Sequence, residues 1–484
     1  MDYLLSNWYS IIVLAINIGL VITIIFVERK NPTSVWSWVL LLALFPIFGF
    51  ILYLLLGRRL RKKHLFRWNG RKDIGIEQLL SEQKSLVKNE TMDYKDETNH
   101  LHKKLIYMQL TNNHAIFTQN NEVNIYTEGT PKFEALLLDI SRAQHHIHMQ
   151  YYIFRDDELG MRLVQALMQK AREGVEVRFL YDAIGSKSFK KRTMKKMREA
   201  GVDTETFFPS IFPMINPRLN YRNHRKIVII DGEVGYIGGF NVGNEYLGKV
   251  EKYGYWRDTH IRVIGDSVFS LQSRFFLDWN AAKKAQALDY SDDYFPESGA
   301  QGDIGIQIVS SGPDNQWEAV KNGYMKMMIS AKRYVYIQTP YFVPDDAIME
   351  AVRLASLSGV DVRIMIPAVP DHKIVYYATM SYVADLLAVG ARVFLYDKGF
   401  LHAKTVVADD EVCTVGTTNF DVRSFKLNFE VNAFIYNEDT SIAMREIFER
   451  DLLDSTELTK AQYEARGFGK KFGESLARLI SPIL

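Results

Sequence analysis

The pattern of hydrophobic and polar positions divides the chain into an apolar amino-terminal part, a polar stretch and a long region of alternating strands and helices. Two apolar runs, Trp8 to Val27 and Val35 to Leu56, each reach the roughly 20 residues that cross a bilayer core as a helix. Residues from about Lys72 to Asn113 are polar and mixed in charge. We therefore predict a membrane hairpin over residues 1–60 and a polar linker or peripheral helices over residues 61–112.

Basic residues flank the apolar runs and are concentrated after the second one. The connection from Glu28 to Ser34 is short and carries Arg29 and Lys30. The exit of the second run carries a larger basic cluster, Arg58, Arg59, Arg61, Lys62, Lys63 and Arg67. The positive-inside rule then predicts a multi-pass protein of the cell membrane, with both ends of the hairpin and its catalytic part on the cytoplasmic side. This cluster either faces anionic lipid headgroups or only fixes the topology.

Two features leave alternatives open for these apolar runs. Pro46 lies within the second run, so a kinked or shallowly inserted helix remains possible in place of a clean span. A cleaved signal peptide is the alternative for the first run. Its flank begins with Asp2 rather than a basic cluster, and no small-residue cleavage site follows, which disfavours cleavage.

Beyond residue 113 the periodicity alternates between strand and helix, and the same order of elements occurs twice. One unit opens with NEVNIYTEGTPKFEALLLDISRA and the other with GIQIVSSGPDNQWEAVKNGYMKMMISA. A strand carrying Gln150 or Gln338 follows, and then a helix, a glycine and another strand. We predict an α/β fold with mixed or largely parallel sheets, in which two similar halves, 113–295 and 296–484, are related by a pseudo-twofold.

One motif occurs once in each half. It spaces His to Lys by two positions, His to Asp by seven and Asp to Gly by seven in both copies. The first copy consists of His224, Lys226, Asp231, Gly238 and Asn241, and the second of His402, Lys404, Asp409, Gly416 and Asn419. A single His-x-Lys is more often part of a half-exposed strand, but two copies at matched spacing favour catalysis. Paired histidines and lysines indicate phosphodiester chemistry.

The residue types suggest how this chemistry works. The unperturbed pKa of histidine, about 6.5, allows one ring to attack phosphorus while the other protonates the leaving oxygen. Strand parity puts His224 and Lys226 on one face, so each motif lysine can hold non-bridging oxygens and replace a metal ion. Asn241 and Asn419 end the returning strands, where an amide can donate to phosphate. Asp231 and Asp409 complete the motif but fall at predicted hairpin turns, which indicates a structural role.

Composition adds little to this picture. The net charge is +2, and Cys413 is the single cysteine, which excludes an intrachain disulfide and a cysteine-based zinc site. We predict no metal and no cofactor. The cluster of His145, His146 and His148 is interpreted as structural, while His372 either contacts a lipid headgroup or lies in a plain surface loop. The tail from Ala465 has amphipathic spacing and lies either on the membrane or on the catalytic body.

The paired motifs resemble those of the phospholipase D superfamily, so the two halves are expected to be phospholipase D-like. The segments NPTSVWSWVLLLALFPIFGFILYLLLGR, RLNYRNHRK and GTTNFDVRSFKLNFEVNA are most similar to the bacterial cardiolipin synthase family. Gly239 and Thr417 stand where a serine commonly follows the motif glycine, and with the two motif asparagines they are expected to line the substrate site. The family commonly shows that glycine.

The resemblance implies a reaction and roles for its residues. One phosphatidylglycerol gives its phosphatidyl group to a histidine, glycerol leaves, and a second phosphatidylglycerol accepts the group. His224 is expected to be the nucleophile and His402 the acid that becomes the base. Asp258 and Glu430, on corresponding strands, are expected to orient the two imidazoles. The expected partners are phosphatidylglycerol and anionic membrane lipid.

Three other functions remain open from the sequence. They are a phospholipase D hydrolase, another phosphatidyltransferase such as a phosphatidylserine synthase, and a nonenzymatic lipid-binding scaffold. Intact His and Lys in both motifs disfavour the scaffold. The two apolar runs tether the site to lipid, which disfavours a nuclease and nucleic acid as a partner.

Overall fold

The structure is a computed structural model that describes residues 11–12, 15–27, 32–53, 75–208, 220–283 and 287–481. The chain forms two compact units. The smaller unit comprises Met1–His64 and Phe208–Tyr221, and the larger comprises Leu65–Phe207 and Arg222–Leu484. Apart from Phe208–Tyr221, both phospholipase D-like halves lie in the larger unit, and the residues of the site described below all belong to that unit.

The smaller unit contains short apolar helices. They are η1 (Thr23–Val27, a π-helix), α2 (Pro32–Leu44) and α3 (Pro46–Leu52). Pro46 ends α2 and starts α3, because it has no N–H to donate and clashes with a continuing helix. Ile24, Leu42 and Tyr53 form a small buried cluster between these segments.

The second predicted run is therefore broken at Pro46, as its kinked alternative implies. Among the described segments of the chain, we find no helix with both the length and the hydropathy needed to cross a membrane. The basic cluster from Arg58 to Arg67 lies outside the described residues.

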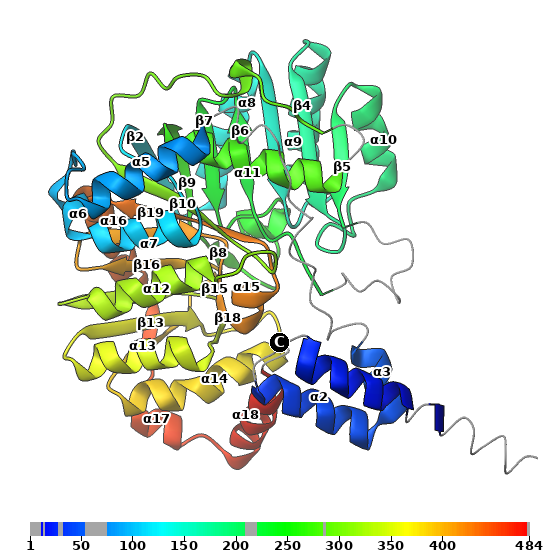
Figure 1. The fold of residues 1–484 in the computed structure, drawn as a ribbon, viewed down its shortest axis with the longest axis vertical. Helices are drawn as coiled ribbons and strands as arrows, with labels where there is room; N and C mark the ends of the chain where they lie inside the picture. Colours follow the sequence, from blue (N-terminus) through cyan, green and yellow to red (C-terminus); the bar gives the residue numbers. More distant parts are fainter. Residues whose placement is uncertain are drawn as a thin grey trace, which may run out of the picture. The chain divides into compact units, whose positions relative to one another are not determined.

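The first half of the larger unit is built on a seven-stranded mixed sheet (Figure 1). Its strands, in spatial order, are β2 (Asn121–Tyr126), β9 (His260–Gly265), β7 (Val234–Gly238), β6 (Ile227–Ile230), β3 (His146–Tyr151), β4 (Glu176–Asp182) and β5 (Asp203–Phe207). β3, β4 and β5 are mutually parallel, whereas β6, β7, β9 and β2 pair antiparallel. The buried run of β-branched residues in β6 favours its place inside the sheet.

The second half repeats this order in a nine-stranded sheet. Its strands are β1 (Phe117–Thr118), β10 (Gly305–Ser311), β19 (Glu430–Tyr436), β17 (Val412–Gly416), β16 (Thr405–Ala408), β11 (Tyr334–Gln338), β13 (Asp361–Pro367), β14 (Arg392–Tyr396) and β20 (Ser455–Glu457). The seven strands from β10 to β14 match β2 to β5 one for one, and β1 and β20 are added at the two edges. The prediction of an α/β fold with two similar halves is confirmed.

Helices cover both sheets. In the first half they are α8 (Gly129–Arg142), α9 (Glu158–Arg172), α10 (Lys191–Glu199), η4 (Asn244–Leu247), α11 (Ser267–Ala282) and η6 (Asp292–Tyr294). In the second half they are α12 (Ala319–Ser330), α13 (Asp346–Leu357), α14 (Lys373–Ala388), α15 (Val422–Lys426), α16 (Glu438–Leu452), α17 (Lys460–Glu464) and α18 (Phe468–Ile480). The equivalent helices α9 and α13 are both capped by aspartate, since Asp157 accepts from the Gly160 amide and Asp345 from the Ile348 amide.

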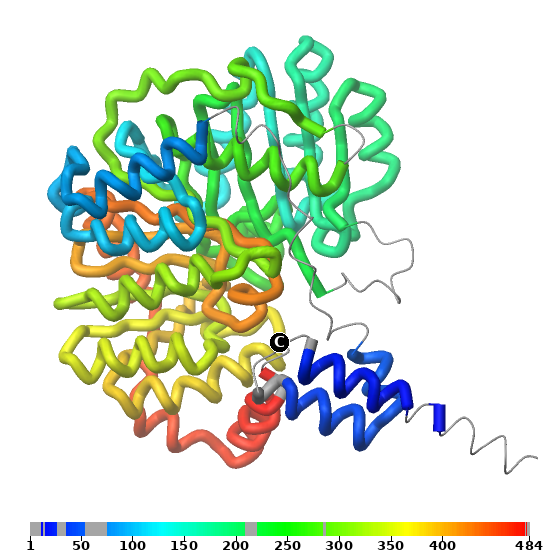
Figure 2. The backbone as a smooth tube through the Cα atoms, in the orientation of Figure 1, coloured from blue at the N-terminus to red at the C-terminus, as the bar shows by residue number. Residues whose placement is uncertain are grey.

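The polar region before the first half forms three helices, α5 (Ile76–Lys88), α6 (Glu97–Leu101) and α7 (Lys103–Asn112). Leu80, Ile106 and Leu110 join the hydrophobic core of the second half, and in Figure 2 this blue and cyan segment runs beside the orange one. β1 also pairs with β10 of the second sheet. The predicted boundary at residue 113 therefore precedes a strand that belongs to the second half.

Two short parallel ladders complete the larger unit. β12 (Phe342–Val343) pairs with β18 (Phe420–Asp421) inside the second half. β8 (Tyr255–Arg257) pairs with β15 (Gly399–Leu401), and this ladder joins the two halves. The second ladder ends directly beside the second motif histidine.

Candidate active site

The two motifs occupy equivalent places in the two sheets. His224 and Lys226 lie on the extended segment just before β6, and His402 and Lys404 lie just before β16. The strands begin slightly later than the sequence predicts, at Ile227 and Thr405. Each lysine folds back toward its own histidine: the Lys226 Nζ donates to the His224 carbonyl at 2.6 Å, and the Lys404 Nζ donates to the His402 carbonyl.

The motif aspartates anchor the hairpin turns that follow. Asp231 has a φ of 54° in the β6–β7 turn, and its carboxylate accepts the backbone amides of Gln144, His145 and His146. Asp409 has a φ of 59° in the β16–β17 turn and accepts the amides of Lys332, Arg333 and Tyr334. Both carboxylates are thus committed to loop contacts, as the turn prediction implies, and neither lines the cavity described below.

The histidines are paired with carboxylates of the opposite half. Nδ1 of His224 lies 2.9 Å from Oε2 of Glu430, which comes from the second half. Nδ1 of His402 lies 2.6 Å from Oδ2 of Asp258, which comes from the first half. An imidazole that donates from Nδ1 to a carboxylate keeps its Nε2 available for chemistry. Each half therefore completes the site of the other.

Equivalent backbone contacts in the two halves place each carboxylate beside the histidine of the other half. Leu401 pairs with Arg257 across the β8–β15 ladder, and the His402 amide donates to the Arg257 carbonyl at 2.7 Å. Likewise, Asn223 and Phe429 form a parallel bridge, and the His224 amide donates to the Phe429 carbonyl at 2.9 Å. In both cases the next residue along the partner strand is the carboxylate. The register of these backbone pairings thus places Asp258 beside His402 and Glu430 beside His224.

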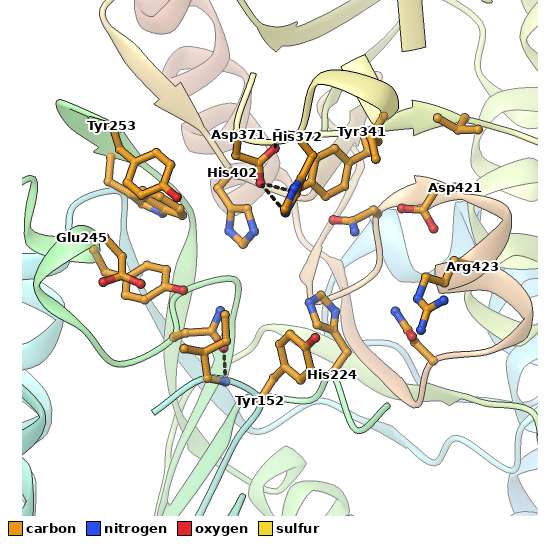
Figure 3. A pocket seen from close by; sticks show the side chains of 18 of the residues that line it. Tyr152, His224, Glu245, Tyr253, Tyr341, Asp371, His372, His402, Asp421 and Arg423 are labelled. Atoms are coloured by element: carbon orange, nitrogen blue, oxygen red, sulfur yellow. Dashed lines mark hydrogen bonds and ion pairs between the residues drawn. The ribbon is translucent and has the colours of Figure 1, made fainter. Parts of the chain in front are cut away.

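A single cavity of about 500 Å³ receives both histidine rings (Figure 3). Residues of both halves line it: Tyr152, Ile153, Arg155, His224, Asn241, Glu245, Tyr246, Tyr253, Trp256, Tyr341, Val343, Asp371, His372, Val375, His402, Asn419, Asp421, Arg423 and Asn428. The structure therefore brings four of the predicted site residues, two histidines and two asparagines, to one cavity. The cavity is large enough for a lipid headgroup.

The motif asparagines face this cavity from equivalent positions. Oδ1 of Asn241 accepts the Ile153 amide at 3.0 Å, and the Asn241 side chain also hydrogen-bonds Tyr246, another residue of the cavity lining. Asn419 is also buried and lines the cavity. An amide NH₂ beside two imidazoles is suited to donate to a phosphate oxygen.

Gly239 and Thr417, expected at the substrate, instead lie against the two orienting carboxylates. The Thr417 hydroxyl donates to Oε2 of Glu430 at 2.5 Å. A Cβ added to Gly239 would stand 1.9 Å from Oδ1 of Asp258. Aspartate is shorter than glutamate, so its carboxylate stays near the backbone, and only glycine leaves room for it. Neither Gly239 nor Thr417 lines the cavity, which gives a physical reason for the different residues in the two motifs.

We expect Gly239→Ala to lower kcat by about 10- to 100-fold, because displacement of Asp258 misplaces His402 and errors near 1 Å are costly in catalysis. Thr417→Ser is the matched control, since it keeps the hydroxyl that donates to Glu430. Steady-state rates and the melting temperature of both variants test this. A Gly239→Ala variant with the wild-type rate would contradict the steric role of this glycine.

Burial dominates the electrostatics of the site. It lowers the pKa of His224 and of His402 to about 4, despite their carboxylate partners. It also lowers the pKa of Lys226 to about 7 and that of Lys404 to about 8. The protein groups of the site are thus two neutral imidazoles and two lysines that lose their charge near neutral pH. Binding of an anion such as phosphate would raise all four pKa values, and the positive charges that result would stabilise the bound anion.

The orienting carboxylates remain ionised. Burial by itself would raise the pKa of Glu430, but His224 and Lys226 outweigh it, so this pKa lies below its ordinary value. In the same way, Lys404 and His402 keep the pKa of buried Asp258 below its ordinary value. The site therefore contains two fixed negative charges behind the imidazoles.

Two buried ion pairs that the sequence analysis missed support the motif segments. Arg225 makes two hydrogen bonds to Asp278, of 2.7 and 2.8 Å, and Gln150 donates to the same carboxylate. In the second half, Gln338 likewise donates to Asp451, but the arginine paired with Asp451 is Arg257 of the first half, since Ala403 stands at the place of Arg225. Arg225 alternates with His224 and Lys226 along the chain, so strand parity could have placed it on the opposite face. Asp278 and Asp451 come from helices that are distant in the sequence, so no local sequence pattern marked them as partners of these arginines.

The other singled-out histidines have different surroundings. His146 and His148 are buried, and both contact the side-chain amide of Gln272 at 2.9 Å. Within the segments that the structure describes, there is no cluster of His, Cys, Asp and Glu that could hold a metal ion. His372 lies at the cavity with an exposed side chain, next to Asp371. Cys413 is fully buried in β17.

Comparison with known proteins places the chain in a family. The family model "Cardiolipin synthase, PLD-like domain" matches residues 136–252 and 324–452, one match in each half, and "Phospholipase_D-nuclease N-terminal" matches residues 15–58. The chain is 54% identical over 469 residues to the major cardiolipin synthase ClsA of Bacillus subtilis, with 97% of each chain covered. It is 51% identical to a cardiolipin synthase of Oceanobacillus iheyensis, again with 97% of each chain covered.

A solved structure shares the fold. The phosphatidylserine synthase of Haemophilus influenzae aligns with a TM-score of 0.60 at 14% identity, covering 79% of this chain and 100% of that one. At such low identity the likeness concerns the arrangement of the two halves only. The two family matches and the close relatives carry the classification: the chain belongs to the bacterial cardiolipin synthase family of the phospholipase D superfamily.

Proposed function

We propose that this protein is a cardiolipin synthase that transfers a phosphatidyl group from one phosphatidylglycerol to another and releases glycerol. The observation that carries this proposal is the pair of motif histidines around one cavity, each held by a carboxylate of the opposite half. A transfer with a covalent intermediate needs a nucleophile and an acid that later acts as a base, and this arrangement provides both.

In the first step, Nε2 of His224 attacks the phosphorus of the donor lipid. The bond from phosphorus to the glycerol oxygen breaks, and His402 gives its proton to that oxygen. Burial lowers the pKa of His402 to about 4, so its proton is retained at neutral pH only when the phosphate anion is bound. Glycerol then leaves, and the phosphatidyl group remains on His224.

In the second step, His402 takes the proton of a terminal hydroxyl on the second phosphatidylglycerol. That oxygen attacks phosphorus, the bond from phosphorus to Nε2 breaks, and His224 is restored. Lys226, Lys404, Asn241 and Asn419 would hold the non-bridging oxygens in both steps. Glu430 and Asp258 would keep the two rings oriented and stabilise their charged forms.

We further propose the organisation that the sequence predicts: a membrane hairpin over residues 1–60, helices over 61–112 and the halves 113–295 and 296–484. The two apolar runs would hold the protein in the cell membrane with its site on the cytoplasmic side. The match of residues 15–58 to a family model of amino-terminal segments supports such an anchor. Extraction of the protein from membranes by alkaline carbonate would contradict it.

Two other reactions would use the same intermediate. Water as the acceptor would make the protein a hydrolase that produces phosphatidic acid, and serine as the acceptor would make it a phosphatidylserine synthase. The fold is shared with a phosphatidylserine synthase, so the fold by itself does not separate these reactions. The acceptor must be identified by product analysis.

We expect purified full-length protein, given labelled phosphatidylglycerol and no other reactant, to produce cardiolipin and glycerol in equal amounts. The activity should survive a chelator, because two lysines supply the positive charge at the phosphate. Lipid products and released glycerol are quantified with and without the chelator. Phosphatidic acid as the main product would favour the hydrolase, and loss of turnover that only a divalent ion restores would contradict the metal-free mechanism.

A further inference from the structure

The carboxy-terminal helix α18 packs against the protein with its small and polar face. Ala477 joins a buried cluster with Ala378 of α14 and Val343 of β12. Buried Glu474 makes an ion pair of 2.6 Å with Arg466, and Ser481 contacts the Tyr382 hydroxyl at 3.0 Å. These contacts fix α18 alongside α14, as Figure 1 shows.

The large apolar side chains of α18 are on its other face. Phe468 is 83% exposed and Leu479 is 78% exposed, and both Phe472 and Leu476 are more than half exposed. At 3.6 residues per turn, these four residues form a stripe roughly 180° from Ala477 and Ser481. A helix of a soluble domain normally buries its apolar face, whereas α18 turns that face away from its own domain.

Further exposed apolar residues lie on α14 and in the loop before it, beside the cavity. Ile374 and Tyr377 of α14 and Val369 of the preceding loop are exposed apolar residues. Val375, which lies between the two exposed α14 residues, both lines the cavity and packs on the cluster that contains Ala477. The exposed apolar face is therefore adjacent to the space that contains the two histidines.

Basic side chains accompany the apolar face. α18 carries three exposed basic residues, Lys470, Lys471 and Arg478. Arg478 forms an ion pair of 2.6 Å with Asp385 of α14, so Lys470 and Lys471 supply the charge that a partner would meet. Its only acidic residue is buried Glu474, which is paired with Arg466. Exposed Lys373 begins α14 on the cavity side. This combination of an apolar stripe and unburied positive charge is complementary to an anionic lipid surface and not to a second apolar protein face.

We propose that α18, together with the exposed start of α14, is a bilayer-docking face that inserts its apolar stripe into anionic lipid and holds the mouth of the cavity at the headgroups. We call it the α18 face: Phe468, Phe472, Leu476 and Leu479 with Val369, Ile374 and Tyr377. The inference rests on the proposed function, because a transferase that joins two lipids must admit both from the bilayer. It adds a contact that does not depend on the amino-terminal apolar runs.

The docking is tested by single cysteines that carry an environment-sensitive fluorophore. Cys413 is fully buried, so Phe472→Cys and Leu476→Cys in the full chain give a defined labelling site. Leu138→Cys is the control, since Leu138 is 50% exposed on α8 of the other half. In phosphatidylglycerol vesicles we expect the labels at 472 and 476, but not at 138, to shift to the blue and to be quenched by nitroxide-bearing lipids.

Two results of the labelling would overturn the proposal. A label at 472 that is neither shifted nor quenched would show that α18 stays in water. A label that is shifted but not quenched by lipid nitroxides would show that another part of the chain, or a second copy, covers the α18 face. Vesicles of phosphatidylcholine alone should give weaker quenching, since the basic residues then have no anionic partner.

Activity provides a second test that separates this proposal from the proposed function. Phe468→Glu/Phe472→Glu should lower the ratio of activity on phosphatidylglycerol vesicles to activity on monomeric short-chain phosphatidylglycerol by at least about tenfold. Leu138→Glu should leave that ratio unchanged. An equal loss on both substrates would mean that α18 serves folding only and would overturn the docking face. If the wild-type protein made cardiolipin from neither substrate, the proposed function would fail while the labelling result would stand.

Discussion

The His224→Ala variant will form no phosphatidyl-enzyme adduct, even from a donor whose activated phenol leaving group needs no proton. The reason is that its nucleophilic Nε2 is removed, while the rest of the cavity is retained. His402→Ala should still form the adduct with this donor, since only the acid is missing. Transfer of the phosphatidyl group from this adduct to the acceptor should then be slow, because the base is missing. Turnover on phosphatidylglycerol should be lower by about 10²- to 10⁴-fold.

The intact-protein mass, measured without acid so that phosphohistidine survives, reports the adduct directly. An adduct in His224→Ala and none in His402→Ala would reverse the assignment of the two histidines. No adduct in the wild type or in either variant would contradict the covalent route. This test is needed because the two rings have equivalent carboxylate partners and the same lowered pKa of about 4, so the geometry of the site does not rank them.

Lys226→Ala and Lys404→Ala should each lower kcat/KM by about 100-fold or more, the scale of a deleted oxyanion donor. Each lysine is buried beside its histidine and donates to that histidine's carbonyl, although no lysine is among the residues that line the described cavity. In the wild type, kcat/KM should also fall more steeply as the pH rises above about 7 to 8, since lysine charge is then lost in addition to the His402 proton. A lysine is charged below its pKa, and burial has lowered the pKa of Lys226 to about 7 and that of Lys404 to about 8.

Initial rates between pH 6 and pH 10, within the range in which the protein stays folded, measure both effects. Lys249→Ala serves as the control, because Lys249 forms an exposed ion pair with Glu158 and does not line the cavity. Near-normal turnover in either motif variant would mean that this lysine does not hold phosphate. A flat profile through pH 8 would contradict the role of lysine charge in the free protein.

The sequence was sufficient to predict the duplication of the fold. A motif of His, Lys and Asp at the same spacing in two strand-rich segments identified the paired sites, since spacing along a strand fixes which side chains share a face. The turns at Asp231 and Asp409 and the order of strands and helices in each half were also readable, because turn chemistry and hydrophobic periodicity are local properties. The structure confirms each of these elements.

For some features the sequence predicted two alternatives without deciding between them. Pro46 left open a broken second apolar helix, and the structure has α2 ending at Leu44 and α3 beginning at Pro46. The periodicity of the tail predicted an amphipathic helix without saying which face would meet the protein. The small residue Ala477 lies against α14, whereas Phe472 points outward. Packing partners, and not periodicity, decided this orientation.

The sequence by itself thus determined which residues are candidates for the chemistry, and the tertiary structure decided how they are combined. Asp258 and Glu430 were recognisable as candidates, but the assignment of each to the histidine of the other half depends on contacts between residues 144 and 206 positions apart. The same long-range packing explains why Gly239 must lack a side chain and why Thr417 is accommodated. Local sequence patterns reflect the conformational preferences of residues that are neighbours along the chain. A site built from two halves depends instead on the backbone register between distant strands.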